Sequence, residues 1–183
     1  MTFHDLNSCR LGALVYADGD TSQKILYDII DMLRNDGVRL GGVAQYSEVV
    51  PGQRRKGMIL EDLASGRRIR ISEYRGNGAS GCRLDRSALA TASELIRAAL
   101  NAGLDLVVIN KFGVTEAEGR GLVPVIAEAV SSGVPVLIAV PQQKLEAWRA
   151  FAGDLACELP LDQSVALRWC RAAVTPSVLK VAS

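Results

Sequence analysis

The stretch LGALVYADGDTSQKILYDIIDMLRNDGVRLGGVAQ, residues 11–45, decides the fold because three patterns follow one another within it. Residues 11–17 form a short apolar run that fits a buried strand, and residues 38–46 read as a second strand. Between them, residues 21–37 place apolar side chains at helical spacing up to a glycine stop. The stretch therefore predicts a strand, a helix and a strand in succession. The apolar helix positions are Ile25, Ile29, Met32 and Leu33.

The rest of the chain continues this alternation of strands and helices. Residues 53–74 predict a β-hairpin that turns at ASGR, residues 64–67, because β-prone stretches flank a Ser-Gly pair. A glycine-rich loop follows at residues 74–85, and its Asp85 can cap the next helix. The remaining predicted elements are a helix at 86–103, a strand at 104–110, a helix near 122–133, a strand at 134–140 and two helices separated by CELPL at 157–161.

Length and composition suit one globular domain. The 183 residues, 49% of them hydrophobic, predict a single α/β domain over residues 1–183, with three α/β/α layers, a mainly parallel sheet and a β-hairpin insertion. The formal net charge is +1 and basic residues are spread along the chain, so we expect no nucleic acid partner. The longest apolar runs fall far below the roughly 20 residues that cross a bilayer. The N-terminus carries no secretory pattern, so we expect a cytoplasmic protein without membrane insertion.

The cysteines give no sign of a metal site. The chain has four cysteines without CxxC spacing and one histidine, whereas a structural zinc site needs four such ligands held close together. We therefore expect no metal, and we expect reduced thiols that are mostly buried. The four cysteines are Cys9, Cys82, Cys157 and Cys170.

The turn YADGDTSQ, residues 16–23, has the outline of a phosphate-binding loop but lacks its chemistry. Such a loop carries GxxxxGK[ST], in which backbone N–H groups wrap the phosphate, lysine neutralises its oxygens and the hydroxyl binds magnesium. Here Thr21 stands at the lysine position and Ser22 at the hydroxyl position, while Asp18 and Asp20 add negative charge. The alternative interpretation is a capped helix start with an acidic first turn, which the helix dipole favours.

Three stretches in order carry a resemblance to a known family. They are GVRLGGVAQ at 37–45, GMILEDLASGRRIRIS at 57–72 and LVVINKFGVTEAEGRGLVPVIAEAVSSGVPVLIAV at 106–140. Together they resemble the small bacterial and archaeal nucleoside-triphosphatases of the P-loop class, over nearly the full chain. More narrowly, the chain is similar to a divergent bacterial branch of that fold, often encoded beside molybdate-transport genes. The resemblance implies a P-loop-NTPase-like topology, a nucleotide ligand and a link to molybdenum.

The chain departs from this family where the chemistry of hydrolysis resides. In the family, a segment IDEIGKME follows the strand opposite the phosphate loop, and the resemblance implies an Asp that organises magnesium and a Glu that orients water. This chain has Asn110 and Lys111 there, and in that segment only Gly113 and Glu116 keep the family's residue types. The Walker A and Walker B residues are thus degenerate, and we expect no dependence on magnesium. Glu116 is left as the candidate for a catalytic group.

Basic residues near the predicted strand ends can supply the missing positive charge. Guanidinium groups offer paired donors to phosphate or to a tetrahedral oxyanion, and open α/β sheets bind ligands at the carboxyl ends of their strands. The alternative is that these residues are solvated surface charges. The candidate ligand-binding residues are Asp18, Gly19, Asp20, Thr21, Ser22, Asn110, Lys111, Arg75, Arg83 and Arg120.

The missing Walker chemistry favours a non-hydrolysing accessory protein that binds a nucleotide or an oxyanion and is linked to molybdenum uptake or use. The alternative is a nucleoside-triphosphatase with rearranged groups, in which Lys24 or Lys111 binds phosphate and Glu116 orients water. A third hypothesis is a self-associating scaffold or a protein with a protein partner, whose interface is formed by aromatic side chains of the last two helices. These side chains are Trp148, Phe151 and Trp169.

Overall fold

A mainly parallel sheet organises the computed structural model, which describes residues 9–48, 57–73 and 83–174. Within these residues, seven strands form one sheet in the order β4-β3-β2-β7-β8-β1-β9. The β3–β4 hairpin runs antiparallel beside β2, and the other five strands are parallel. Two further strands, β5 (Ser72–Glu73) and β6 (Arg83–Leu84), form a separate antiparallel pair. The strands of the main sheet are β1 (Leu11–Tyr16), β2 (Leu40–Glu48), β3 (Gly57–Asp62), β4 (Arg68–Arg70), β7 (Leu106–Ile109), β8 (Val136–Pro141) and β9 (Ala156–Leu159).

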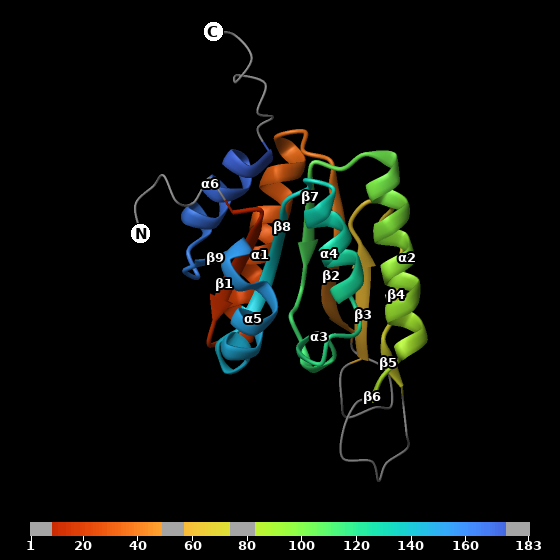
Figure 1. Ribbon diagram of the computed structural model, residues 1–183. Helices are drawn as coiled ribbons and strands as arrows, with labels where there is room; N and C mark the ends of the chain where they lie inside the picture. The colour runs from red at the N-terminus through yellow and green to blue at the C-terminus, as the bar shows by residue number, and fades with distance from the viewer. Residues whose placement is uncertain (1–8, 49–56, 74–82, 175–183) are drawn as a thin grey trace, which may run out of the picture.

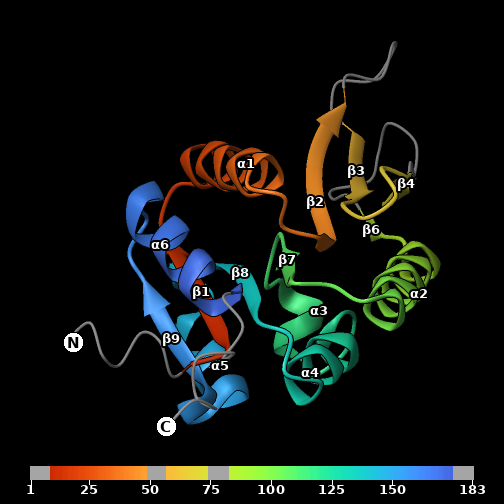
Figure 2. The ribbon, with the colours of Figure 1, turned by 90° about the horizontal axis from the view of Figure 1, so that it is seen from above.

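Helices cover both faces of the sheet and give the molecule three layers. Figure 1 labels the elements, and Figure 2 shows α1 and α6 on one face and α2, α4 and α5 on the other. This arrangement confirms the predicted α/β/α class, the mainly parallel sheet and the hairpin insertion after the second strand. The helices are α1 (Gly19–Asn35), α2 (Arg86–Ala102), α3 (Val114–Ala117), α4 (Val123–Ser131), α5 (Leu145–Ala152) and α6 (Gln163–Val174), with 3-10 turns at Gln142–Lys144 and Gly153–Leu155.

Each face of the sheet builds its own apolar cluster, because successive strand residues point to opposite faces. In β7, Val107 and Ile109 belong to the cluster that includes residues of α2, α4 and α5. Leu106 and Val108 belong to the cluster that includes residues of α1 and α6. All four side chains are fully buried, which explains why the central strands read as continuous apolar runs in the sequence.

Two adjacent glycines allow β2 to lie close to its neighbours. Gly42 has φ +102°, and a Cβ atom there would lie 2.0 Å from the carbonyl oxygen of Val108 in β7. A Cβ atom at Gly41 would meet only the end of the Leu104 side chain, at 2.1 Å, and that end can move. Gly42, the last glycine of the GVRLGGVAQ stretch, is therefore required by the pairing of β2 with β7.

Two predictions about the elements were wrong. The segment CELPL, predicted as a connection between helices, contains most of β9, a parallel edge strand beside β1. Half-buried and buried positions alternate in β9, but four residues are too few for this alternation to stand out from a loop in the sequence. Met32, predicted on the buried face of its helix, is 39% exposed, because Leu26, Ile30 and Leu33 fill that face of α1.

The cysteines correct the expectation of reduced thiols. Cys9 and Cys157 form a disulfide with their Cα atoms 6.0 Å apart, whereas Cys170 is free and buried. The pairing of β9 with β1 brings Cys157 close to the residues that precede β1, so a sequence interpretation without β9 had no reason to join the two cysteines. Cys82 lies outside the described residues. Within the described ranges, no helix combines the length and the apolar character needed to cross a membrane.

We expect the replacement Cys157→Ser to lower the free energy of unfolding of the oxidised chain by about 2–4 kcal/mol, because the cross-link restricts the unfolded chain. The two cysteines are 148 residues apart in the sequence, so the loop that they close is long. Urea unfolding with and without a reductant measures the effect, with Cys170→Ser as the control that keeps the disulfide. A wild-type unfolding midpoint that does not respond to the reductant would show that the bond does not stabilise the fold.

An ion pair at the start of two neighbouring strands makes stability depend on pH. Asp105 accepts hydrogen bonds from the backbone N–H of Arg39 at 2.8 Å and from its guanidinium group at 2.7 and 3.0 Å. The hydrogen bonds from the Arg39 guanidinium are the main reason why the pKa of Asp105 lies below its usual value. A lowered pKa in the folded state adds stability above the ordinary carboxyl pKa, and this stability is lost as the pH falls through the folded pKa.

We therefore expect Asp105→Asn to destabilise the chain at neutral pH and to lose this disadvantage progressively in acid. Urea midpoints of both proteins at pH 7, 5 and 3 check the expectation. A difference between wild type and variant that stays constant across this range would rule out the ion pair as its source.

Candidate functional site

The candidate site lies at the edge of the sheet where the parallel strands end, because open α/β sheets bind ligands there. This edge is the lower one in Figure 1, where α3 is drawn. Tyr16 at the end of β1 is level with Pro141 of β8, whereas Ile109 at the end of β7 is level with Ile138 of β8. The sequence predicted that the turn after β1 and the segment after β7 form one site. Because β8 lies between these two strands, β1 and β7 are about 10 Å apart across the sheet.

The turn between β1 and α1 is too short to wrap a phosphate group. The strand ends at Tyr16 and the helix begins at Gly19, so only Ala17 and Asp18 lie between them. A phosphate-binding loop places several consecutive backbone N–H groups around the anion before the helix starts. Two residues do not provide such a cradle. The turn is therefore shorter than the loop of a GxxxxGK[ST] motif, and it also lacks the lysine of that motif.

The Asp18 side chain caps the first turn of α1. One of its carboxylate oxygens, Oδ2, accepts hydrogen bonds from the backbone N–H of Thr21 at 3.3 Å and from the Thr21 hydroxyl at 2.5 Å. The Ser22 hydroxyl donates to the backbone carbonyl of Gly19 at 2.9 Å, and Ser22 is buried. The two hydroxyls that the sequence placed at Walker positions are thus used inside the turn. This geometry agrees with the alternative interpretation of a capped helix start.

Asn110 and Lys111 lie directly after β7. The backbone N–H of Asn110 donates a hydrogen bond to the carbonyl of Val43 in β2. Phe112, which follows Lys111, is fully buried and packs against Trp148. Lys111 between these anchored positions is exposed. No described residue forms an ion pair or a hydrogen bond with its ammonium group. Lys111 is therefore an exposed cation at the carboxyl edge, on a backbone that its two neighbours anchor.

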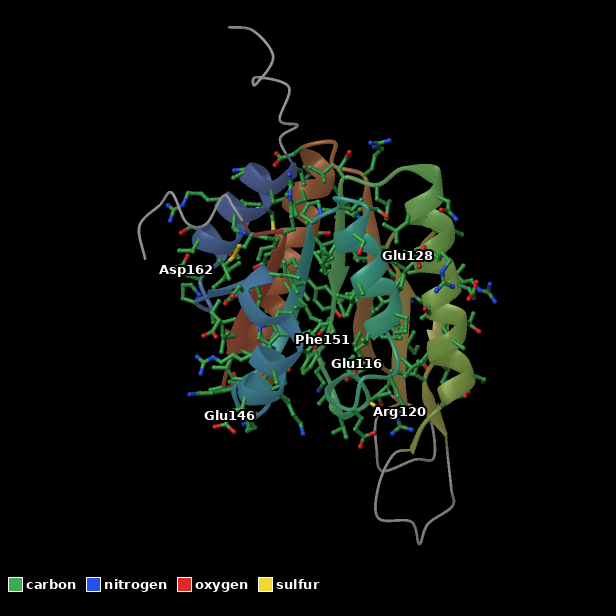
Figure 3. All side chains as sticks on the ribbon, in the orientation of Figure 1. Glu116, Arg120, Glu128, Glu146, Phe151 and Asp162 are labelled. Carbon is green, nitrogen blue, oxygen red and sulfur yellow. A yellow bond between two sulfur atoms is a disulfide. The ribbon has the colours of Figure 1, made fainter. Side chains whose placement is uncertain are left out.

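Glu116 is buried and braces the loop that it belongs to. Its Oε2 atom accepts from the backbone N–H of Gly113 at 3.0 Å, and its Oε1 atom accepts from the backbone N–H of Leu122 at 3.2 Å. Figure 3 shows Glu116 and Arg120 in this loop between β7 and α4. Both carboxylate oxygens thus hold backbone groups at the two ends of the loop. The structure gives Glu116 a structural role in place of a free carboxylate that could face water.

The predicted basic residues do not form one described cluster. Arg120 pairs with Glu118 of its own loop, so much of its charge is neutralised there. Arg83 lies in β6, but only its backbone is described, and Arg75 lies outside the described residues. Asp20 belongs to the first turn of α1, without a description of its side chain. In the described part of the chain, no group of His, Cys, Asp and Glu side chains could hold a metal ion.

A hollow on the side of α1 was not predicted from the sequence. It has a volume of about 410 Å³ and is lined by Gln23, Lys24, Tyr27 and Asp28. These residues lie on the helix beyond its first turn, beside the end of β2, where Tyr27 stacks on Tyr46 with ring centroids 4.8 Å apart. The sequence offered one signal for it, because polar and aromatic side chains recur four residues apart on this helix.

Comparisons with known proteins agree with the fold and add a family. The family model described as Protein of unknown function (DUF2478) matches residues 11–169. A protein named Molybdenum import ATP-binding protein ModC 2, from Bradyrhizobium diazoefficiens, is 37% identical over 169 residues, which is 92% of this chain and 19% of that protein. The chain thus spans about a fifth of the length of this relative.

A solved structure has the same architecture. The solution structure of a human cancer-related nucleoside triphosphatase matches with a TM-score of 0.61 and 18% sequence identity, over 90% of this chain and 94% of that one. At this identity the likeness shows the fold alone. It supports the P-loop-NTPase-like topology that the order of strands and helices predicted.

Proposed function

Since this chain belongs to the DUF2478 family, we propose that it is a non-hydrolysing accessory protein that binds a nucleotide or an oxyanion and is linked to molybdenum uptake or use. The observation that carries the proposal is the likeness to the ModC 2 protein, whose name joins ATP binding to molybdenum import. That likeness covers 92% of this chain but a small part of the relative. The proposal treats residues 1–183 as one P-loop-NTPase-like domain that works in the cytoplasm.

The non-hydrolysing part of the proposal rests on what the strand ends offer to a triphosphate. Phosphoryl transfer depends almost entirely on positioning and on positive charge around the transferred group. The turn before α1 holds two residues and is closed by the Asp18 carboxylate, which repels phosphate. Asn110 carries no charge to hold magnesium. The groups that normally supply this stabilisation are replaced by neutral or negative ones.

The binding part of the proposal rests on the positive charge that remains at the same edge. Lys111 follows β7 as an exposed cation without a described partner, and the Asn110 side chain beside it carries an amide that can donate a hydrogen bond. An ammonium group binds phosphate or a tetrahedral oxyanion such as molybdate as a point charge. Arg75 and Arg83 stay proposed accessory residues, whereas Arg120 already pairs with Glu118.

A calorimetric screen tests this function. The ligands are ATP, GTP, ADP, molybdate, tungstate and phosphate, each with and without magnesium. Binding that does not require magnesium supports the proposal, and Lys111→Ala is expected to weaken the binding of oxyanions, with Lys144→Ala as the matched control. If the wild-type chain binds none of these ligands, the proposed function is wrong.

A nucleoside-triphosphatase with rearranged groups is the second candidate, because Lys111 has no partner among the described residues and lies at the edge where a triphosphate would bind. It requires magnesium-dependent nucleotide binding followed by phosphate release. The same screen separates the two candidates, since only the second predicts that magnesium strengthens nucleotide binding.

A further inference from the structure

We infer that the hollow on the side of α1 binds a purine nucleotide, with guanine preferred over adenine and without magnesium. This inference rests on the proposed function and gives it a place and a ligand class. The hollow has a volume of about 410 Å³ and is wide open to solvent, so a ligand in it lies along the helix surface. Its four lining residues, Gln23, Lys24, Tyr27 and Asp28, provide an amide, an ammonium group, an aromatic ring and a carboxylate.

Hydrogen bonds fix the wall of the hollow that faces β2. The Gln23 side-chain amide donates to the Tyr27 hydroxyl at 3.0 Å and to the backbone carbonyl of Gln45 at 2.5 Å, and the Tyr27 hydroxyl donates to the same carbonyl. The rings of Tyr27 and Tyr46 stack with an angle of 16° between their planes, and the Arg68 guanidinium lies over the Tyr46 ring. The aromatic wall is therefore held in place before any ligand arrives, which lowers the entropic cost of binding.

Tyr27 presents a neutral ring to the ligand. Burial raises the pKa of Tyr27 to about 12, so the phenol keeps its proton at neutral pH. One face of the ring is covered by Tyr46, and Tyr27 is one of the four residues that line the hollow, so the inference requires a planar ligand to stack on the other face of the ring. Stacking of a base on an aromatic side chain strengthens binding whichever base is present, because every base has a π face.

Lys24 and Asp28 are charged side chains, and no described residue neutralises either of them. Neither forms a hydrogen bond or an ion pair with a described residue, and the two do not pair with each other although they are four residues apart on one helix. Their Cβ atoms are about 5–6 Å apart at this spacing. A cation and a carboxylate thus line one hollow next to an aromatic ring, and each can pair with a ligand group of opposite character.

A nucleotide carries the three complementary groups within one molecule. Its phosphate pairs with the Lys24 ammonium group, and its base stacks on Tyr27. A carboxylate is an acceptor with two oxygens, so Asp28 is best satisfied by two neighbouring N–H donors. Guanine presents two such donors on one edge, its ring N–H and its amino group, whereas adenine presents only its amino group. This difference gives the preference for guanine.

The hollow is distinct from the closed turn before α1. Its residues begin at Gln23, beyond the first turn that Asp18 caps, and the phosphate of the ligand would meet Lys24 rather than Thr21 or Ser22. Nucleotide binding here does not need a glycine-rich loop or a metal ion. The loss of the Walker residues and the binding of a nucleotide are therefore compatible in one chain.

Calorimetric titrations of the full chain with GMP, IMP, AMP and guanosine in the presence of a chelator test the inference. GMP is expected to bind at least about tenfold more tightly than AMP, because a hydrogen bond to a charged group contributes about 1.5–3 kcal/mol. IMP, which lacks the amino group of guanine, is expected to fall between them. Asp28→Asn should remove the preference for GMP, and Lys24→Gln should weaken the binding of GMP without changing that of guanosine.

The matched control is Asp31→Asn, which makes the same change of charge on an exposed position of the same helix and should leave GMP binding unchanged. If Asp28→Asn and Lys24→Gln bind GMP like wild type, or if only Lys111→Ala abolishes GMP binding, the inference is wrong and the proposed function stands. If the chain binds molybdate but no nucleotide, the inference is also wrong and the proposed function also stands. A chain that binds no nucleotide and no oxyanion overturns both.

Discussion

Replacing Gly42 with alanine is expected to lower the free energy of unfolding by about 4 kcal/mol or more, as the sum of backbone strain and overpacking. Gly42 adopts φ +102°, a conformation that residues with a Cβ atom rarely reach, and its Cβ atom would lie 2.0 Å from the carbonyl oxygen of Val108. The strand β7 cannot move away without losing the pairing that places Asn110 and Lys111 at the carboxyl edge. Since domains are stable by only about 5–15 kcal/mol, much of the variant would be unfolded or insoluble.

Two control variants separate the causes of this loss, with urea unfolding followed by tryptophan fluorescence as the measurement. Gly66 also has a positive φ, +73°, but a Cβ atom there has no neighbour within 4 Å, so Gly66→Ala measures backbone strain alone. Gly41→Ala measures contact with the movable end of Leu104. If Gly42→Ala cost no more than Gly66→Ala, the close approach of β2 to β7 would not be required for the fold.

Replacing Glu116 with alanine is expected to cost about 3 kcal/mol of stability, because the backbone N–H groups of Gly113 and Leu122 would lose their only described acceptor in a buried place. The loss does not depend on catalysis. Glu118→Ala, two residues away and exposed, is the matched control, since a surface ion pair such as that with Arg120 contributes less than about 1 kcal/mol.

The two roles considered for Glu116 predict opposite results. A carboxylate that activates water would lose phosphate release on replacement while the fold stayed stable. The brace observed here predicts a lower unfolding midpoint, with partial recovery in Glu116→Gln, whose amide oxygen can still accept one of the two bonds. An unfolding midpoint equal to that of wild type would rule out the brace.

The sequence predicted the parallel layers well because the fold relies on strong local patterns. The apolar runs of β7 and β8 and the periodic apolar positions of α1 each identify an element without reference to the rest of the chain. Elements that depend on distant partners were missed. The edge strand β9 is stabilised by β1, and the disulfide of Cys9 with Cys157 follows only from that pairing.

The candidate site was predicted less completely, since its properties depend on distances that a sequence does not contain. Counting residues placed Thr21 and Ser22 at Walker positions, but the helix already begins at Gly19 and leaves a turn of two residues. The pattern located Lys111 correctly at the end of a strand, yet β8 separates it from that turn. The residues that line the hollow come from one short stretch of α1, but the contacts of Gln23 and Tyr27 with Gln45 and Tyr46 of β2 are not encoded in that stretch.

The most direct test of the non-hydrolysing assignment is single-turnover phosphate release, with the chain in excess over ATP or GTP and with magnesium present. We predict that phosphate appears at the rate of the buffer alone, because the closed turn at Asp18 and the neutral Asn110 provide no stabilisation for phosphoryl transfer. Release well above the buffer rate, lost in Lys111→Ala, would contradict this assignment and show that rearranged groups catalyse hydrolysis.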